Sequence, residues 1–236
     1  LATLNDRDVV EANGNAILNT VLDGNRVAAC LKSVAIRGTM MCVRLPRKRV
    51  FTLDEYLQQG FFSPRPEIFD SELETKLQRD AQDGDAGLVE YLKFALAQGL
   101  SVLVSGSTST GKTALLNLLI SFLPSHVRVI CCEDTKELQI PTANHVRLLE
   151  DRQSQVGLRQ LIEFTLRLRP DAIIAGEVRG SEAADLIAAL NTGHFGMGSL
   201  HANSARDALT RVETMMRRAD GGSPIDAIQR EIATGV

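Results

Sequence analysis

Residues 106–113 bring together glycine, small hydroxyl side chains and a single lysine in the order GSTSTGKT. The spacing G-x-x-x-x-G-K-[ST] lets main-chain N–H groups surround a chain of phosphates, while the lysine and the last hydroxyl reach the phosphate oxygens and their Mg²⁺. A turn with an exposed lysine is the structural alternative. The pattern favours an ATP and Mg²⁺ site, formed by Gly106, Ser107, Thr108, Ser109, Thr110, Gly111, Lys112, Thr113 and Ala114.

The residues on either side of this segment support the phosphate interpretation. Residues 100–104 form an apolar run that is typical of a strand buried on both faces, and residues 113–123 predict a helix that ends at Pro124. A phosphate site needs this order of strand, loop and helix, because the N–H groups at the helix N-terminus face the bound anion.

Three polar segments follow other predicted strands, at residues 133–135, 176–179 and 199–204. In a parallel sheet such segments meet at the carboxyl edge, where α/β proteins bind ligands. ATP hydrolysis needs a carboxylate that orients or deprotonates water. Glu177 is the best candidate, because it follows the most apolar strand, where an acidic side chain is costly without a task or a partner. An ion pair with Arg179 is the structural alternative.

Three further polar residues are candidates for the same site. Glu133 and Asp134 could hold Mg²⁺ through water, although one of them could equally cap a helix or turn. His201 could contact the γ-phosphate, although an isolated histidine is more often structural. The expected Mg²⁺ shell is therefore Thr113, Glu133 and Glu177, partly through water.

Strand and helix patterns alternate from residue 100 onward, which predicts an α/β fold with a mostly parallel sheet covered by helices. Strands are expected at residues 100–104, 127–132, 146–149, 172–175 and 199–200, and helices at 88–98, 113–123, 157–167, 181–190, 204–216 and from 223, with Pro224 at the first helical position. Earlier in the chain we expect a hairpin at residues 21–27 and strands at 34–36 and 41–43. A helix is expected to begin at a capping box at residues 52–55, with a hydrophobic staple between Phe51 and Tyr56, and a short helix is expected after residue 71.

The composition of the chain argues against some classes of protein. The chain is 44% hydrophobic and 23% charged with a net charge of −3, so it is no polycation that would bind nucleic acid through charge alone. The short basic run that includes Arg47, Lys48 and Arg49 is expected to be solvated. Four cysteines without a C-x-x-C pair fit a reducing cytosol, and no apolar run approaches membrane-spanning length. Because residue 1 is Leu, we expect a fragment.

Four segments, GSTSTGKT, CCEDTKELQ, LRLRPDAIIAGEVRG and NTGHFGMGSLHANSARDALTRVETMM, occur in this order. Together they resemble the secretion-superfamily traffic ATPases of type II and type IV secretion, and most of all the TrbB-like conjugal transfer ATPases and their Tad-pilus relatives. The resemblance runs from about residue 22 to the C-terminus. It implies a RecA-like P-loop NTPase domain at 51–236, truncated at its C-terminus, preceded at 1–50 by part of a small α+β N-terminal domain and the start of a linker.

The resemblance also implies site residues and partners. Glu177 corresponds to the catalytic glutamate, Glu133 to an acidic box, and His194 and His201 to a histidine box. Arg44 is the best match for an arginine near the γ-phosphate, and Arg26 is second. The family assembles as a homo-hexamer on the cytoplasmic side of the inner membrane, as a peripheral partner of secretion or pilus subunits. It implies no sequence-specific binding of nucleic acid.

Two departures from the family pattern affect the expected activity. Ser107 and Ser109 stand where the family's loop usually has glycine, and serine tolerates a positive φ less well. The chain also ends where the family's sheet is expected to continue. The four-cysteine zinc site of the type II branch is absent, which argues against that branch. We therefore weigh three hypotheses: an ATP-hydrolysing motor of a conjugative or pilus system, a nucleotide-dependent scaffold with weak or no hydrolysis, and a RecA-like DNA motor. The last lacks the basic groove and stacking aromatics that it would need.

Overall fold

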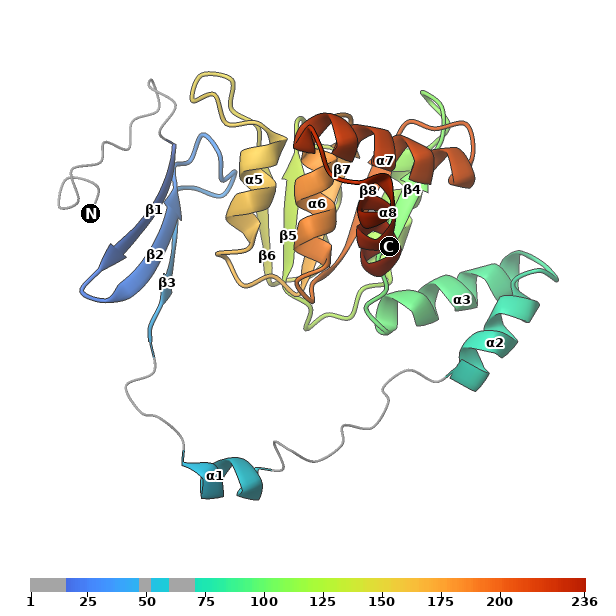
Figure 1. The fold of residues 1–236 in the computed structure, drawn as a ribbon, viewed down its shortest axis with the longest axis horizontal. Helices are drawn as coiled ribbons and strands as arrows, with labels where there is room; N and C mark the ends of the chain where they lie inside the picture. The colour runs from blue at the N-terminus through green and yellow to red at the C-terminus, as the bar shows by residue number, and fades with distance from the viewer. Residues whose placement is uncertain (1–15, 47–51, 60–70) are drawn as a thin grey trace.

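The computed structural model describes residues 16–46, 52–59 and 71–236 (Figure 1). The expected staple involving Phe51 and the basic residues Arg47, Lys48 and Arg49 lie outside the described residues. Within them, the chain forms two sheets and eight helices.

A five-stranded parallel sheet forms the centre of the fold, in the order β4-β8-β7-β5-β6. Its strands are β4 (Val102–Ser105), β5 (Val129–Glu133), β6 (His145–Leu149), β7 (Ala172–Val178) and β8 (Phe195–Leu200). Every residue of β5 is buried, as a strand with neighbours on both edges and helices on both faces requires. This confirms the α/β fold with a parallel sheet.

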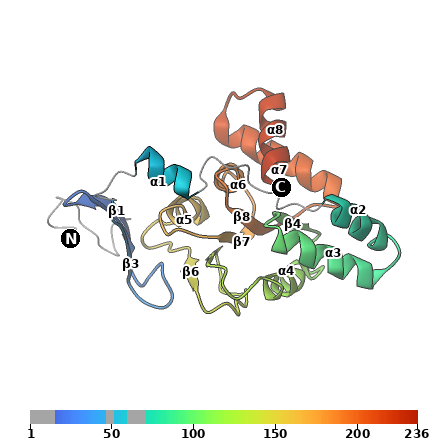
Figure 2. The ribbon, with the colours of Figure 1, turned by 90° about the horizontal axis from the view of Figure 1, so that it is seen from below.

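Helices cover both faces of this sheet (Figures 1 and 2). The helices are α1 (Leu53–Gln58), α2 (Ser71–Asp80), α3 (Asp85–Ala97), α4 (Lys112–Ser121), α5 (Leu158–Thr165), α6 (Glu182–Leu190), α7 (Ala205–Asp220) and α8 (Ile225–Gly235). Alternate residues of β5 show the division: Ile130 and Cys132 join the core formed with α5 to α8, whereas Val129 and Cys131 join the core formed with α3 and α4.

A smaller antiparallel sheet precedes the central one and contains β1 (Ile17–Leu22), β2 (Asn25–Cys30) and β3 (Met40–Arg44). Its hairpin turns at Asp23 and Gly24, whose φ angles of 49° and 77° give the two-residue turn that the Asp-Gly pair predicts. The segment after β2 reaches β6: Leu149 N donates to Val34 O over 2.8 Å, and Ala35 forms an antiparallel bridge with Leu148.

Most expected elements are present, but several boundaries differ. The expected strand at 34–36 is wrong, because these residues form a turn that makes only the single bridge to β6. Pro224 precedes the first helical residue of α8 rather than occupying that position. The strand expected at 199–200 begins at Phe195, and α7 continues to Asp220, where Gly221 ends it with a φ of 63°.

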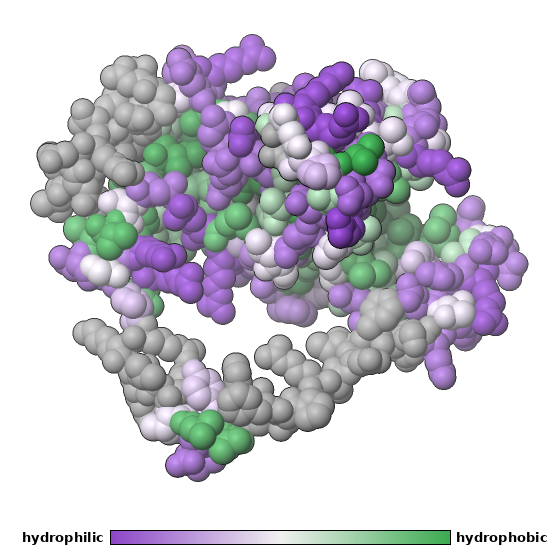
Figure 3. All heavy atoms as spheres, in the orientation of Figure 1, coloured by the Kyte–Doolittle hydropathy of each residue, from purple (hydrophilic) through white to green (hydrophobic). Residues whose placement is uncertain are grey.

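The capping box at Thr52 is confirmed, because its hydroxyl accepts from Glu55 N while the Glu55 carboxylate accepts from Thr52 N. The short helix that it begins, α1, buries none of its residues. Leu53 and Leu57 of α1 are exposed, and Figure 3 shows hydrophobic surface in the region of this helix. Among the described residues, no helix is both long and apolar enough to cross a lipid bilayer.

Candidate nucleotide-binding and catalytic site

The segment 106–113 joins the end of β4 to the start of α4, as the sequence predicts. Gly111 lies at the N-cap of α4 with a φ of 88°, and Ser109 has a φ of 62°, so two residues take the left-handed region that wraps the loop. A Cβ atom on Gly106 would approach Thr110 Oγ1 to 2.5 Å, and the Thr110 hydroxyl donates to Ser107 O over 2.8 Å. The loop is therefore compact, with residues 107–111 exposed to solvent.

The start of α4 is suited to an anion. Its first turn holds no acidic residue to complement the helix dipole and instead begins with Lys112. A cation at a helix N-terminus is unfavourable unless a negative group accompanies it. Lys112 Nζ donates to Ser107 O over 2.9 Å, which uses one of its three hydrogens and holds the ammonium over the loop.

Glu177 lies near the end of β7, where the pairing with β8 is interrupted between Ala175 and Val178. Such a break in a ladder frees the residues within it to direct their side chains away from the regular pleat. Ser199 Oγ donates to Gly176 O over 2.6 Å and ties the irregular segment to β8. The side chain of Glu177 is 19% exposed, and its Oε1 atom is buried without an aligned hydrogen-bond donor among the described residues.

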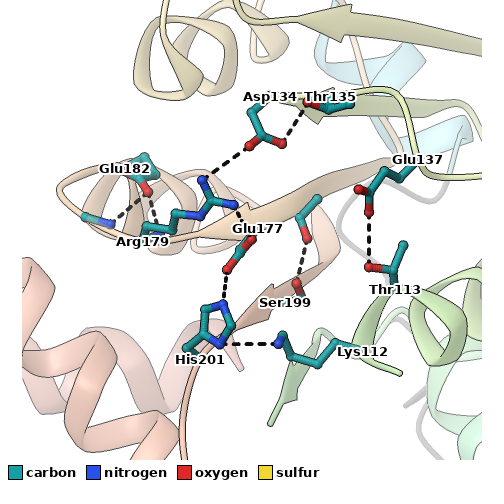
Figure 4. Close-up of polar contacts among 12 residues, drawn as sticks. Lys112, Thr113, Asp134, Thr135, Glu137, Glu177, Arg179, Glu182, Ser199 and His201 are labelled. Atoms are coloured by element: carbon teal, nitrogen blue, oxygen red, sulfur yellow. Dashed lines mark hydrogen bonds and ion pairs between the residues drawn. The ribbon is translucent and has the colours of Figure 1, made fainter. Parts of the chain in front are cut away.

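His201 connects the lysine to this carboxylate (Figure 4). Its Nδ1 lies 3.4 Å from Lys112 Nζ, and its Nε2 lies 2.7 Å from Glu177 Oε1 in a close contact rather than an aligned hydrogen bond. Because an ammonium can only donate, Nδ1 accepts from it and the ring proton then lies on Nε2, on the side of the carboxylate. Residues that are 89 positions apart in sequence, at the ends of neighbouring strands, are thus brought together.

Glu177 also receives the guanidinium of Arg179, which lies 2.5 Å from Oε2. This hydrogen bond is the main reason that the pKa of Glu177 lies below its usual range, while partial burial acts in the opposite direction. The ion pair considered as an alternative role for Glu177 therefore exists beside its contacts with the site.

Glu133 occupies a different environment from the one expected. Its side chain is 1% exposed and accepts from the main-chain N–H groups of Glu137 and Leu138 over 2.8 and 2.7 Å. Arg147 Nε lies 3.6 Å from its second oxygen. A Cβ atom on Gly176 would lie 3.1 Å from Glu133 Cγ, so the glycine of β7 gives this side chain its space. Glu133 thus fixes the loop after β5 from the inside.

The loop fixed by Glu133 places another carboxylate at the phosphate segment. Glu137 Oε2 lies 3.3 Å from Thr113 Oγ1, and Gln139 N donates to Asn117 Oδ1 of α4 over 2.7 Å. Sequence reasoning missed Glu137, although it lies in the same polar run as Glu133. The signal was the run itself, EDTKE, but its spacing alone does not say which acid turns inward.

Three other residues named from the sequence lie elsewhere. Arg26 and Arg44 are exposed partners on β2 and β3, in the sheet that lies beside β6, while the phosphate loop follows β4 at the opposite edge (Figure 1). His194 precedes β8 and lies 2.8 Å from Thr192 Oγ1, at the opposite end of that strand from His201.

A family model described as Type II/IV secretion system protein matches residues 69–234. The chain belongs to this family. Two curated members show the same relationship: VirB11 of Bartonella quintana is 30% identical over 230 residues, and the conjugal transfer protein TrbB of Rhizobium radiobacter is 31% identical over 202. These matches span 90% and 84% of this chain but 65% and 55% of the relatives, so the chain corresponds to part of their length.

A solved structure extends this agreement to the fold. The VirB11 ATPase from the Brucella suis type IV secretion system, crystallised with sulphate, superposes with a TM-score of 0.88 at 29% sequence identity. The superposition covers all of this chain and 72% of that one. The resemblance to the type II/IV secretion family and the RecA-like fold expected from it are confirmed.

The residues of this secretion-family chain fit Mg-ATP. Four features point to the same ligand: the compact loop, the lysine at a helix start, the hydroxyl of Thr113 beside a carboxylate, and the buried Glu177 oxygen that lacks an aligned donor. No group of three or more His, Cys, Asp or Glu side chains among the described residues could hold a metal by itself.

Proposed function

We propose that this chain is the ATP-hydrolysing part of a type IV secretion or pilus motor. The observation that supports this most directly is the chain of contacts from Lys112 through His201 to Glu177, at the carboxyl ends of three strands. It gives one site a phosphate-binding ammonium, a histidine between that ammonium and a carboxylate, and the carboxylate of Glu177, which can accept a proton from water once its contacts with His201 and Arg179 open.

The chemistry follows from these positions. The loop amides and Lys112 hold the β- and γ-phosphates, and the Thr113 hydroxyl and Glu137 lie where the accompanying Mg²⁺ would be held. Bound Mg²⁺ supplies the positive charge that neutralises the phosphate oxygens. Glu177 accepts a proton from water as the water oxygen bonds to the γ-phosphorus. The bond from phosphorus to the bridging oxygen breaks, and ADP and phosphate leave.

The finer parts of the proposal concern the whole protein. We propose that residues 1–50 belong to an N-terminal domain and linker, that residues 51–236 form the ATPase domain, and that the assembly is a homo-hexamer. It would attach peripherally to secretion or pilus subunits at the inner membrane. The names of the relatives, a type IV secretion protein and a conjugal transfer protein, support this setting.

Calorimetry and phosphate release test the proposal. Lys112→Ala should abolish the heat of Mg-ATP binding, whereas Lys32→Ala, which removes an exposed lysine of a turn after β2, should leave it unchanged. Glu177→Gln should bind Mg-ATP with similar affinity and lose turnover by about 10²–10⁴-fold, the usual contribution of a general base. Undiminished turnover in Glu177→Gln would remove the carboxylate from its proposed role.

A scaffold that binds nucleotide without hydrolysing it is the second candidate. It is favoured by one observation, the 2.5 Å contact between Arg179 and Glu177, which occupies one oxygen of the proposed base. Tight Mg-ATP binding without phosphate release by the wild-type protein would select this candidate over the motor.

A further inference from the structure

Arg179 lies between two carboxylates at the edge of the site (Figure 4). Its Nη2 is 2.5 Å from Glu177 Oε2, and its Nη1 is 3.3 Å from Asp134 Oδ2, in the loop after β5. The guanidinium is planar and offers donors on two sides, so it can stay paired with one acid when it leaves the other. Arg179 therefore pairs with both carboxylates at once, so its guanidinium can release one while it keeps the other.

The main chain of Arg179 is fixed while its side chain is not. Its own N–H and that of Gly180 both donate to Glu182 Oε1, over 2.6 and 2.8 Å. The side chain is 62% exposed and borders a hollow of about 420 Å³, which Asp134 and Glu177 also line. The guanidinium therefore has room to move without any change in the backbone.

Charged groups that follow all five strands of the central sheet act on Glu177 or on its partner Arg179. Arg179 lowers the pKa of Glu177 most, through the hydrogen bond, and His201 and Lys112 lower it further. The hydrogen bond to Glu177 raises the pKa of the Arg179 guanidinium most, and the charges of Glu177, Asp134 and Glu150 raise it further. A carboxylate held in this way is a weaker base toward water than one with an ordinary pKa.

We propose that Arg179 is a positioning residue that restrains Glu177 through Oε2 and releases it, keeping its ion pair with Asp134, when Glu177 takes up the attacking water. Asp134 then holds the released guanidinium, and its only effect on turnover passes through Arg179. This inference rests on the proposed function, because it gives Glu177 the role of base. It assigns tasks to Arg179 and Asp134 that ATP binding alone does not require.

Single and double variants of the full chain test the exchange. Asp134→Asn should lower kcat by about two- to ten-fold with little change in KM, because an exposed ion pair of this kind contributes roughly 1 kcal/mol. Arg179→Gln should raise kcat near pH 8. The double variant should behave like Arg179→Gln alone.

Arg211→Gln is the matched control, because it removes another exposed arginine that borders a neighbouring hollow with Arg179. It should leave kcat and KM unchanged. Additive effects in the double variant, or an Arg179→Gln kcat equal to that of the wild type, would overturn the exchange. Glu177→Gln separates the two proposals: if it is inactive while the double variant is additive, only the exchange fails, and if it is fully active, both fail.

Discussion

The two serines of the phosphate loop should respond in opposite ways to substitution by glycine. Ser109 has a φ of 62°, whereas Ser107 is not among the residues with positive φ. We therefore expect Ser109→Gly to stabilise the protein and Ser107→Gly to destabilise it. The two changes are identical in chemistry and lie two residues apart, so each serves as the control for the other.

The magnitude follows from two opposing terms. An L-residue in the left-handed region costs about 1–2 kcal/mol relative to glycine. Glycine in turn gives the unfolded chain more freedom, which costs about 0.4–1 kcal/mol. Ser109→Gly should therefore gain roughly 0.8 kcal/mol, the midpoint of the ~0–1.6 kcal/mol that the two terms leave, whereas Ser107→Gly should lose about 0.4–1 kcal/mol because it has no strain to relieve. For a chain of this size these are shifts of about 1–4 °C in the melting temperature, in opposite directions.

Thermal unfolding followed by circular dichroism, without nucleotide and at one protein concentration, measures both shifts. Equal destabilisation by the two substitutions would show that Ser109 is not strained and would refute the assignment of left-handed strain to the loop. A gain at Ser109 would mean that the serine is retained at a cost in stability. Calorimetric titration with Mg-ATP would then show whether the glycine variant binds more or less tightly.

Two further substitutions test the packing of the sheet and the loop after β5. Gly196→Ala should lower the free energy of unfolding by about 1–3 kcal/mol or more, because its Cβ would lie 2.4 Å from Ile173 O. Gly198→Ala is the control: its Cβ meets its first neighbour at 3.4 Å, so the loss should be under about 1 kcal/mol. Equal losses of stability in urea denaturation would contradict this expectation. Glu133→Gln should lower the free energy of unfolding by about 3 kcal/mol, because it removes one charge of a buried ion pair whose carboxylate also binds the loop amides. A loss of stability no larger than that for an exposed carboxylate would rule out the structural role of Glu133.

The sequence predicted the phosphate loop and the central sheet because both depend on local patterns. A segment with the spacing of residues 106–113, placed between an apolar run and a helix, usually forms a phosphate-binding loop. Strands that are fully buried, such as β5, have a nearly continuous apolar sequence. The strand expected at residues 34–36 failed for the complementary reason. Val34 and Ala35 are apolar because they join the core that contains Leu148, whereas Ile36 is exposed. Apolar character alone does not distinguish a strand from a partly buried turn.

The direction of individual side chains could not be read from the sequence. Glu133 and Glu137 are both acidic and lie in the same segment, yet one is buried against main-chain amides and the other faces Thr113. What decides between them is the space left by Gly176 on the neighbouring strand and the position of Arg147 on β6. Both are contacts between strands that are distant in the chain, so no local pattern contains them.

The arginines implied by the family resemblance raise the question of which subunit they serve. Arg26 and Arg44 face each other as direct neighbours on β2 and β3, an arrangement of like charges that is unfavourable unless an anion lies near them. The sheet that carries them adjoins β6, and the four strand spacings from β6 to β4 amount to about 19 Å, which is longer than an arginine side chain. An arginine held there cannot contact a nucleotide bound after β4 of the same subunit in this arrangement.

If either arginine assists hydrolysis, it therefore acts on the nucleotide of another copy. An Arg44→Ala chain and a Lys112→Ala chain should each be inactive, and mixing them should restore part of the phosphate release, because mixed assemblies contain intact loops that face intact arginines. Recovery should increase with the time allowed for subunits to exchange. Activity that stays absent after full exchange would place Arg44 outside the reaction or in its own subunit's site, and the geometry of the smaller sheet would then have to change during turnover.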